Sequence, residues 1–432
     1  MKHINSILRS YLKSDVSRRM AKGTFWTFTG TASAKFIVLI AGIICARILG
    51  KESYGELGII RSTIITFLSV GIAGLGLTAT KFISEYKQDQ SHRIPSIYII
   101  TTRFSVILGT LISGLIIVFA QDIATTIDNP SLSDDLRWGG VLLFLGILNG
   151  IQNGVLSGFE DFKSIAINSL YGSISESILM CIGAYYGGVK GAIIGYGTGY
   201  IVIYLFNRQS VIRNLKRHNL SIALSKFDKN DLSIIYKFSL PAALSSILSA
   251  PVFWIIKTLL IRHDGYGQMA IYEAADQWRI IILFIPTAIS NVVLPILSSM
   301  VNHSNHDFWK VLRINILLNA GISLFLTLGI CLFSRQIMEF YGKDFGDGMT
   351  LIILCVSSIF TSISNVVGLS ISSRNKMWHG FVFNVTWGVM LIVLTHIYLQ
   401  MNYGATSVAI AMLISNFAIT LIQIIYLRRV IK

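Results

Sequence analysis

Residues 25–86 read FWTFTGTASAKFIVLIAGIICARILGKESYGELGIIRSTIITFLSVGIAGLGLTATKFISEY. Two apolar runs, near residues 24–46 and 55–79, flank a short polar turn that contains Lys51 and Glu52. A helix of about 20 apolar residues crosses the ~30 Å hydrocarbon core of a bilayer. The stretch therefore predicts two antiparallel helices that span a membrane.

The rest of the chain repeats this pattern. Of the 432 residues, 53% are hydrophobic and only 13% are charged, whereas about a quarter of the residues are charged in a soluble domain. The 36 glycines suit helices that pack closely through small residues. The sequence predicts an all-α polytopic membrane protein with twelve transmembrane helices, near residues 24–46, 55–79, 96–119, 137–157, 165–187, 190–206, 238–261, 271–299, 312–333, 348–369, 377–399 and 404–427.

The distribution of positive charge predicts the orientation. The formal net charge is +15, and Lys and Arg collect in the cytoplasmic loops of membrane proteins. With the N-terminus in the cytoplasm, 24 of the 36 Lys and Arg residues fall on the cytoplasmic side and 7 on the other side. Both termini are therefore predicted to be cytoplasmic. Because no basic segment carries exposed aromatic residues, we expect no nucleic-acid partner.

An internal repeat divides the chain. Three pairs of segments match at offsets of 214, 216 and 212 residues: 154–162 with 368–376, 188–195 with 404–411, and 53–55 with 265–267. Each half then holds six spans, an even number, so the halves have parallel topology about a pseudo-two-fold axis along the membrane normal. Two similar lobes that rock around a central site are typical of transporters.

The predicted organisation has four parts. Residues 1–22 form a basic segment with apolar residues at helical spacing, typical of a helix on an anionic membrane surface. A disordered basic tail is the alternative for this segment. Residues 23–207 form an N-lobe of helices 1–6, residues 208–237 a cytoplasmic linker, and residues 238–432 a C-lobe of helices 7–12.

Charged residues lie inside the predicted spans, where charge is costly and usually faces an aqueous cavity. The cations are Lys35, Arg61, Arg103, Lys257 and Arg279, and the acids are Glu176, Glu273 and Asp276. Five cations against three acids predict a net-positive central cavity, which would attract an anionic cargo.

The arginines suit a phosphate-binding role, because a planar guanidinium bonds two phosphate oxygens at once. Arg61 and Arg279 are our candidates for a pyrophosphate clamp. Lys35 and Lys257 would add point charge from the first helix of each lobe, and Arg103 is a fifth candidate. For Arg61 and Arg103, which lie within two turns of a span end, snorkelling to the headgroups is the alternative.

The acids have two interpretations. Glu273, Asp276 and Arg279 lie at i, i+3 and i+6, on one helical face. In the simpler interpretation, Asp276 and Arg279 form a structural ion pair. In the other, the acids, including Glu176, bind Na⁺ or H⁺ and couple an ion gradient to transport.

Prolines cluster in the seventh and eighth predicted spans, as Pro241, Pro251, Pro286 and Pro295. Proline removes a backbone hydrogen bond and kinks a helix. These four residues are therefore candidate hinges for alternating access. Static bends are the alternative.

The sequence lacks motifs for enzymatic chemistry. No GxxxxGK[ST] motif is present, so the chain has no nucleotide-hydrolysing loop of its own. His303 and His306 lie in a polar loop without a Cys or carboxylate set to complete a metal site. We expect no catalytic residues, no cofactor and no bound metal.

The opening stretch resembles the start of bacterial polysaccharide flippases of the Wzx (O-antigen) type. These belong to the multidrug/oligosaccharidyl-lipid/polysaccharide exporter superfamily. Length and span count agree over the whole chain. The shared features are Ala46-Arg47, Leu49-Gly50, Tyr54-Gly55 at the first outer turn, and a Gly-rich second span that ends in a charged Lys81…Glu85-Tyr86 segment.

The resemblance implies a V-shaped pair of six-helix lobes. It implies a location in a bacterial inner membrane. It also implies movement of undecaprenyl-pyrophosphate-linked oligosaccharide from the cytoplasmic to the outer leaflet by alternating access, for example in the synthesis of lipopolysaccharide O-antigen. A cationic cavity would receive the sugar-pyrophosphate while the lipid tail stays in the bilayer. The expected partners are this lipid-linked oligosaccharide, membrane lipids, Na⁺ or H⁺, and polysaccharide assembly proteins.

Two other functions are alternatives to this one. An ion-coupled multidrug or cation antiporter of the same superfamily would need an acidic cavity, and the charge inside the spans has the opposite sign. A membrane glycosyltransferase or polymerase would place its catalytic residues on large outer loops. The predicted outer loops are short.

Overall fold

The computed structural model describes residues 15–72, 74–220, 248–299, 305–346, 348–373 and 376–430. Within these ranges every regular element is a helix. This confirms the predicted all-α membrane fold. Pro241, residues 1–14 of the basic N-terminal segment, and most of the predicted linker lie outside the described residues.

The first group of helices, here called the N-lobe, ends at Arg217. Its long helices are α2 (Asp15–Leu49), α3 (Lys51–Ile72), α4 (Leu75–Asp89), α5 (Ile94–Val118), α7 (Ser133–Gly158) and α8 (Phe162–Arg217). Its short elements are η1 (Ser91–Arg93), α6 (Ala120–Thr126) and η2 (Pro130–Leu132).

The second group, here called the C-lobe, begins at Ser249. Its long helices are α11 (Ser249–Ser299), α12 (Asn305–Leu332), α14 (Met349–Ser373), α15 (Met377–Leu399) and α16 (Ala405–Val430). Its short elements are α13 (Ser334–Glu339) and η5 (Lys343–Phe345).

Two of the long helices reverse direction at a glycine. In α8 the backbone leaves helical angles at Gly188 (φ 57°), and in α11 it does so at Gly265 (φ 81°). Side chains other than glycine rarely adopt such positive φ angles. Each helix is therefore two antiparallel arms. With the arms counted separately, the long helices follow the order of the predicted spans, while the count of twelve remains a prediction.

The positions of four glycines support the predicted repeat. The turn between α2 and α3 lies at Gly50 (φ 79°), and its counterpart in the C-lobe is Gly265 (φ 81°). The turn inside α8 lies at Gly188 (φ 57°), and its counterpart before α16 is Gly404 (φ 58°). The two pairs are separated by 215 and 216 residues, close to the offsets of the sequence matches.

Several element boundaries differ from those predicted. The α2 helix begins at Asp15, so residues 15–22 continue into the first long helix rather than forming a separate segment. The α8 helix continues to Arg217, ten residues beyond the predicted end of the N-lobe at residue 207. The predicted second span breaks in two, because α3 ends at Ile72 and α4 starts after Gly74, where φ is 79°.

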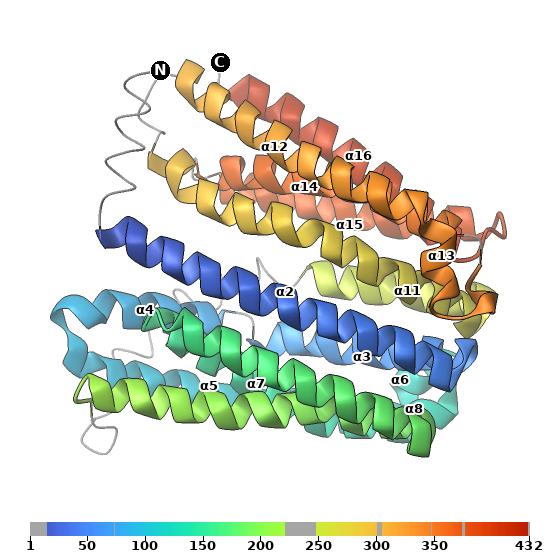
Figure 1. Cartoon of the computed structure of the whole chain (residues 1–432), viewed down its shortest axis with the longest axis horizontal. Helices are drawn as coiled ribbons and strands as arrows, with labels where there is room; N and C mark the ends of the chain where they lie inside the picture. Colours follow the sequence, from blue (N-terminus) through green and yellow to red (C-terminus); the bar gives the residue numbers. More distant parts are fainter. Residues whose placement is uncertain are drawn as a thin grey trace.

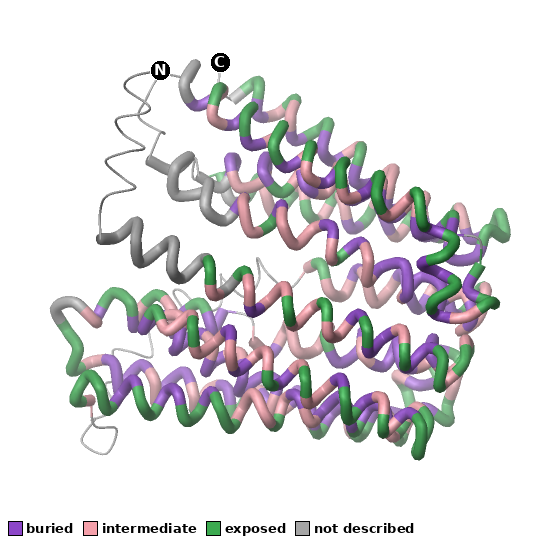
Figure 2. Tube along the Cα trace, viewed as in Figure 1, coloured by how far each residue is buried: buried purple, intermediate pink, exposed green. Residues whose placement is uncertain are grey.

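The surface of the helices fits a bilayer. Among the described residues, nine helices are long and apolar enough to cross a membrane. Large apolar side chains lie on the outside, such as Phe325 and Leu332, each 77% exposed. Figure 2 shows exposed residues along the outward sides of both lobes and buried residues where helices pack together. Such an apolar surface is unfavourable in contact with water and favourable in contact with the hydrocarbon of a bilayer.

The two lobes meet along α3 and α11 and diverge toward one end of the molecule (Figure 1). At this end α2 begins and α16 ends, and we call it the terminal end. The lobes converge at the opposite end, which carries the turn between α2 and α3, the reversal inside α11, and the short helices α6 and α13; we call it the turn end. The α2 helix belongs to the N-lobe by its packing on α8, and its Phe28 ring also stacks on Phe284 of α11 at 5.0 Å.

Candidate functional site

Glycines allow α3 and α11 to approach closely. A Cβ atom on Gly55 would lie 2.1 Å from the carbonyl oxygen of Tyr266, a distance that no real contact permits. A Cβ atom on Gly58, one turn further along α3, would lie 3.3 Å from Cγ of Glu273. The contact between the lobes therefore depends on these glycines, and it brings the side chain of Glu273 directly against α3.

Three of the predicted cations form ion pairs with the three predicted acids. Lys257 Nζ donates to Oε2 of Glu273 at 2.9 Å. Nε of Arg279 donates to Oδ1 of Asp276 at 2.5 Å. These two pairs lie in the C-lobe, whereas the third lies in the N-lobe, where Nη2 of Arg61 is 3.8 Å from Oε1 of Glu176. All six side chains are at most 16% exposed.

The hairpin of α11 explains why Lys257 meets Glu273. The two residues lie eight positions before and eight positions after Gly265, where the helix reverses. Because the two arms run antiparallel, residues at equal distances from the reversal lie side by side. The sequence predicted a pair between Asp276 and Arg279, which is present, but it did not predict that Glu273 would face Lys257 on the other arm.

Arg61 is the least satisfied of the three paired cations. Its distance to Glu176 exceeds that of a hydrogen bond, and its Nε atom is buried without a hydrogen-bond partner among the described residues. The guanidinium also lies 4.9 Å from the centre of the Tyr196 ring. Because a guanidinium carries five N–H donors, Arg61 retains capacity to bind an anion.

The two other predicted cations differ from this set. Lys35 on α2 is half-buried, and no ion pair to it occurs within the described part of the chain. Arg103 on α5 is exposed, so it does not belong with the buried charges. With the other three cations paired to carboxylates and Arg103 at the surface, the excess of buried positive charge over buried negative charge falls from two to one.

The two residues of the predicted clamp lie in different lobes, Arg61 on α3 and Arg279 on α11. Arg279 is buried within the C-lobe, with its guanidinium 5.5 Å from the centre of the Phe253 ring. Whether the two guanidiniums bind one pyrophosphate stays a prediction. On the C-lobe side, Glu273, the partner of Lys257, packs against Gly58, which lies one turn from Arg61 on α3.

The proline positions do not coincide with a break in α11. Pro251 lies in the first turn of the described helix, where proline is tolerated. The helix continues through Pro286 and Pro295, and its backbone departs from helical angles at Gly265 instead. Whether any proline acts as a hinge remains a prediction.

Polar residues that the sequence did not single out join the lobes at the turn end. Gln277 of α11 donates from Nε2 to the hydroxyl of Tyr54 on α3 at 2.6 Å, and the hydroxyl of Tyr341 donates to Oε1 of Gln277 at 3.3 Å. Nearby, Tyr266 donates to the carbonyl of Ile127. The only sequence signal was the match between 53–55 and 265–267, which places a tyrosine beside a glycine at both turns.

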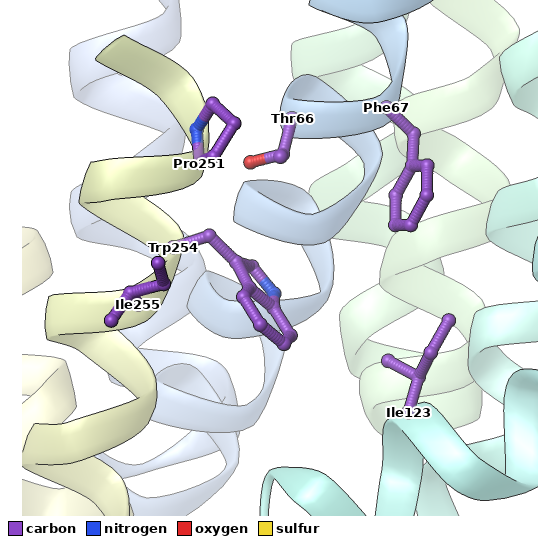
Figure 3. A pocket seen from close by; sticks show the side chains of 6 residues that line it. All are labelled: Thr66, Phe67, Ile123, Pro251, Trp254 and Ile255. Atoms are coloured by element: carbon purple, nitrogen blue, oxygen red, sulfur yellow. The ribbon is translucent and has the colours of Figure 1, made fainter. Parts of the chain in front are cut away.

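A cavity of about 250 Å³ lies between α3 and α11, with α6 at one side (Figure 3). Its lining is apolar apart from the Thr66 hydroxyl, and consists of Thr66, Phe67, Ile123, Pro251, Trp254 and Ile255. The indole Nε1 of Trp254 donates to Thr63 at 2.9 Å, which leaves the ring as a wall of the cavity. With no charged residue in its lining, the cavity suits hydrocarbon and cannot pair a phosphate.

The cavity adjoins the ion pairs on the same two helices. Trp254 lies one turn before Lys257 on α11, and Thr66 lies five residues after Arg61 on α3. A charged region and an apolar region are therefore neighbours at the place where the lobes meet.

The fold and this interface define a class: a multi-span helical membrane protein built like the transporters of the MOP superfamily. The chain resembles the structure described as an inward-facing conformation of a multidrug resistance MATE family transporter of that superfamily. The TM-score is 0.77, the identity is 17%, and the alignment covers 92% of this chain and 94% of the other. At this identity the likeness concerns the fold.

Residues 20–301 match the family described as polysaccharide biosynthesis protein, and the chain belongs to this family. It is 28% identical over 203 residues to the EPS I polysaccharide export inner membrane protein EpsE of Ralstonia solanacearum. That match covers 46% of this chain and 47% of the relative, so the chain spans about half the length of that protein. It is also 25% identical over 371 residues to the probable flippase AglR of Haloferax volcanii, covering 82% of this chain and 69% of AglR.

Proposed function

We propose that this protein is a flippase that moves an oligosaccharide, linked through pyrophosphate to undecaprenyl, from the cytoplasmic to the outer leaflet of the bacterial inner membrane. Membership of the polysaccharide biosynthesis family supports a role in polysaccharide export, as do the names of the relatives EpsE and AglR. The observation that carries the proposal is the apolar cavity beside the ion-paired groups on α3 and α11. An anionic lipid presents these same two chemistries side by side.

The pyrophosphate would bind between Arg61 and Lys257. Arg61 supports this assignment because its Nε atom is buried without a partner and its carboxylate neighbour is 3.8 Å away. Lys257 would add a second positive charge from the other lobe. In a low-dielectric site such charges attract phosphate oxygens far more strongly than they do in water.

The first part of the polyprenyl chain would occupy the cavity lined by Thr66 and Trp254. Hydrocarbon can pack against Phe67 and Ile255 without breaking a hydrogen bond of the lining, because the Trp254 indole keeps its bond to Thr63. The sugar would extend toward the terminal end, where the helices of the two lobes diverge.

Alternating access would follow from rocking of the lobes about this site. The hydrogen bonds of Gln277 to Tyr54 and of Tyr266 to Ile127 hold the turn end together. The excess of Lys and Arg in the loops of the terminal end supports a cytoplasmic location for that end. The conformation described here is then the one that receives cargo from the cytoplasm.

An ion-coupled cation antiporter is the second candidate. The three membrane-buried carboxylates and the likeness to a multidrug transporter favour it. A cationic substrate would, however, have to compete with Lys257, Arg61 and Arg279 for those carboxylates. This competition makes a cationic substrate less suited to the site than an anionic one.

Transport by purified protein in liposomes tests the proposal. The liposomes contain a polyprenyl-pyrophosphate oligosaccharide, and a glycosidase added outside reports the sugar that reaches the outer leaflet with time. The test variant is Arg61→Gln with Glu176→Gln, which removes both charges of the pair and leaves no unpaired buried charge. We expect its rate to fall by about tenfold or more, since loss of a buried charge contact typically costs about 2–5 kcal/mol.

The matched control is Arg103→Gln, which removes the same guanidinium from an exposed position of the same lobe. Its rate should stay within about twofold of the wild type, because exposed charges contribute little. If the double variant transports normally, the phosphate site is misassigned. Transport of a lipophilic cation, with none of the sugar-lipid, would favour the antiporter.

A further inference from the structure

Glu273 occupies the place where an anionic cargo would bind. Its Oε2 atom accepts from Nζ of Lys257 at 2.9 Å, and its Cγ atom packs on Gly58 of α3. Arg61 lies one turn beyond Gly58 on the same helix, and its Nε has no hydrogen-bond partner among the described residues. The Glu273 carboxylate is therefore an anion of this protein's own, paired with a lysine of one lobe and packed one turn away from an arginine of the other.

We propose that an anionic cargo group displaces Glu273 from Lys257, and that the displaced carboxylate takes up a proton from the water on the cytoplasmic side. Cargo binding and proton uptake are then coupled at a single side chain. The inference rests on the proposed function, since it assumes a phosphate-bearing cargo.

The cost of burying charge makes the exchange necessary. An ammonium group inside the membrane is stable when a neighbouring anion neutralises it. A phosphate oxygen that approaches Nζ of Lys257 while Glu273 is bound there meets the repulsion of a second negative charge in a low-dielectric site. Once displaced, Glu273 would be a buried carboxylate without its cation, which costs several kcal/mol. Binding a proton removes that charge.

The exchange at Glu273 compensates one negative charge of the cargo. Before binding, Lys257 and Glu273 sum to zero. After binding, Lys257 faces one negative charge of the pyrophosphate and Glu273 is neutral, so one proton compensates one of the two negative charges that a pyrophosphate diester brings. The net charge of the site then falls by one instead of two, which lowers the cost of moving the cargo through the bilayer as the lobes rock.

Among the charged and titratable groups of this region, Glu273 is the acid best placed for the exchange. Lys257 and Tyr272 lie on its own hairpin, Tyr54 and Arg61 lie on α3, and Tyr341 lies beyond α13. The nearby Asp276 has its own partner in Arg279, within hydrogen-bond distance and buried in the C-lobe. Glu176 lies with Arg61 in the N-lobe and is the competing candidate.

Calorimetry with farnesyl pyrophosphate, a short soluble polyprenyl pyrophosphate, tests the proposal on the full-length protein in detergent. Titrations in two buffers of different ionisation enthalpy give the number of protons taken up per bound ligand. We expect about one proton for the wild type, and an affinity that falls by about tenfold for each unit of rising pH where uptake is complete, as linkage requires.

Glu273→Gln removes the exchanging charge but keeps the shape of the side chain. It should bind the ligand at least as tightly as the wild type and take up no proton beyond that due to the ligand itself. Glu176→Gln is the matched control and should keep the uptake. If Glu273→Gln folds poorly because Lys257 is left unpaired, Lys257→Gln with Glu273→Gln should fold, bind more weakly and take up no proton.

The outcomes separate the two proposals. Binding without proton uptake, or uptake that is lost in Glu176→Gln and kept in Glu273→Gln, overturns the exchange at Glu273 but leaves the flippase proposal standing. If the wild type does not bind the pyrophosphate at any pH, both proposals fail.

Discussion

Removal of one hydrogen bond at the turn end should shift the balance between the two conformations of the lobes. The Tyr54 hydroxyl accepts from Nε2 of Gln277 at 2.6 Å where α3 meets α11, with Tyr54 buried and Gln277 half-buried. Tyr54→Phe deletes the acceptor and nothing else. The Nε2 donor of Gln277 then loses its acceptor at a half-buried position whenever the turn end is closed.

The magnitude follows from the cost of such a donor. A buried donor left without its acceptor costs about 1–3 kcal/mol. When the turn end opens, water can reach the donor, so the cost applies to the closed form alone. The ratio of open to closed molecules should therefore rise by about 5-fold to 150-fold.

Pulsed electron resonance between spin labels at Gln121 on α6 and Gln336 on α13 measures this ratio. The two positions lie at the turn end, one in each lobe. The Tyr54→Phe variant should gain a longer-distance population, and Tyr171→Phe, which changes an exposed tyrosine of the N-lobe, should not. An unchanged distance distribution in Tyr54→Phe would refute the role of this bond in holding the lobes together.

Two further substitutions test other parts of the account. Gly55→Ala places a Cβ atom 2.1 Å from the carbonyl oxygen of Tyr266 and should force α3 away from α11. A lower melting temperature, or a longer distance between the same two spin labels, would report this separation. Gly114→Ala, at a position with open space, should change neither the melting temperature nor the distance. Asp276→Asn leaves Arg279 buried and unpaired, so the free energy of unfolding should fall by about 3–5 kcal/mol in a thermal melt. Adding Arg279→Met should recover much of this loss. A melting temperature of Asp276→Asn equal to that of the wild type would show that the pair carries no structural role.

The sequence predicted the fold well because the signals for it are local. Apolar runs long enough to cross a bilayer, and glycines at the turns, determine where helices begin and end. The errors occurred where tertiary packing decides the boundary. At Ile72 the apolar pattern continues through the break between α3 and α4, and at Arg217 a polar sequence stays helical because α8 packs on α7.

The candidate site was predicted by composition but not by arrangement. Charge inside a span identified Arg61 and Lys257, since such residues are rare unless they are functional or paired. Which carboxylate faces which cation depends on how the residues of one antiparallel arm align with those of the other. Glu273 reaches Lys257 because both are eight residues from Gly265, and this follows only once the reversal at Gly265 is known. For Arg103, near a span end, snorkelling to the headgroups was the alternative, and this residue is exposed.

A structure of the protein with a short-chain polyprenyl pyrophosphate bound, determined by electron cryomicroscopy, would show where the phosphates and the hydrocarbon lie. We expect the phosphates between Arg61 and Lys257, with Glu273 turned away and the hydrocarbon in the cavity beside Trp254. Phosphates bound at Arg279, or a ligand that leaves the Lys257–Glu273 pair intact and the cavity empty, would contradict it.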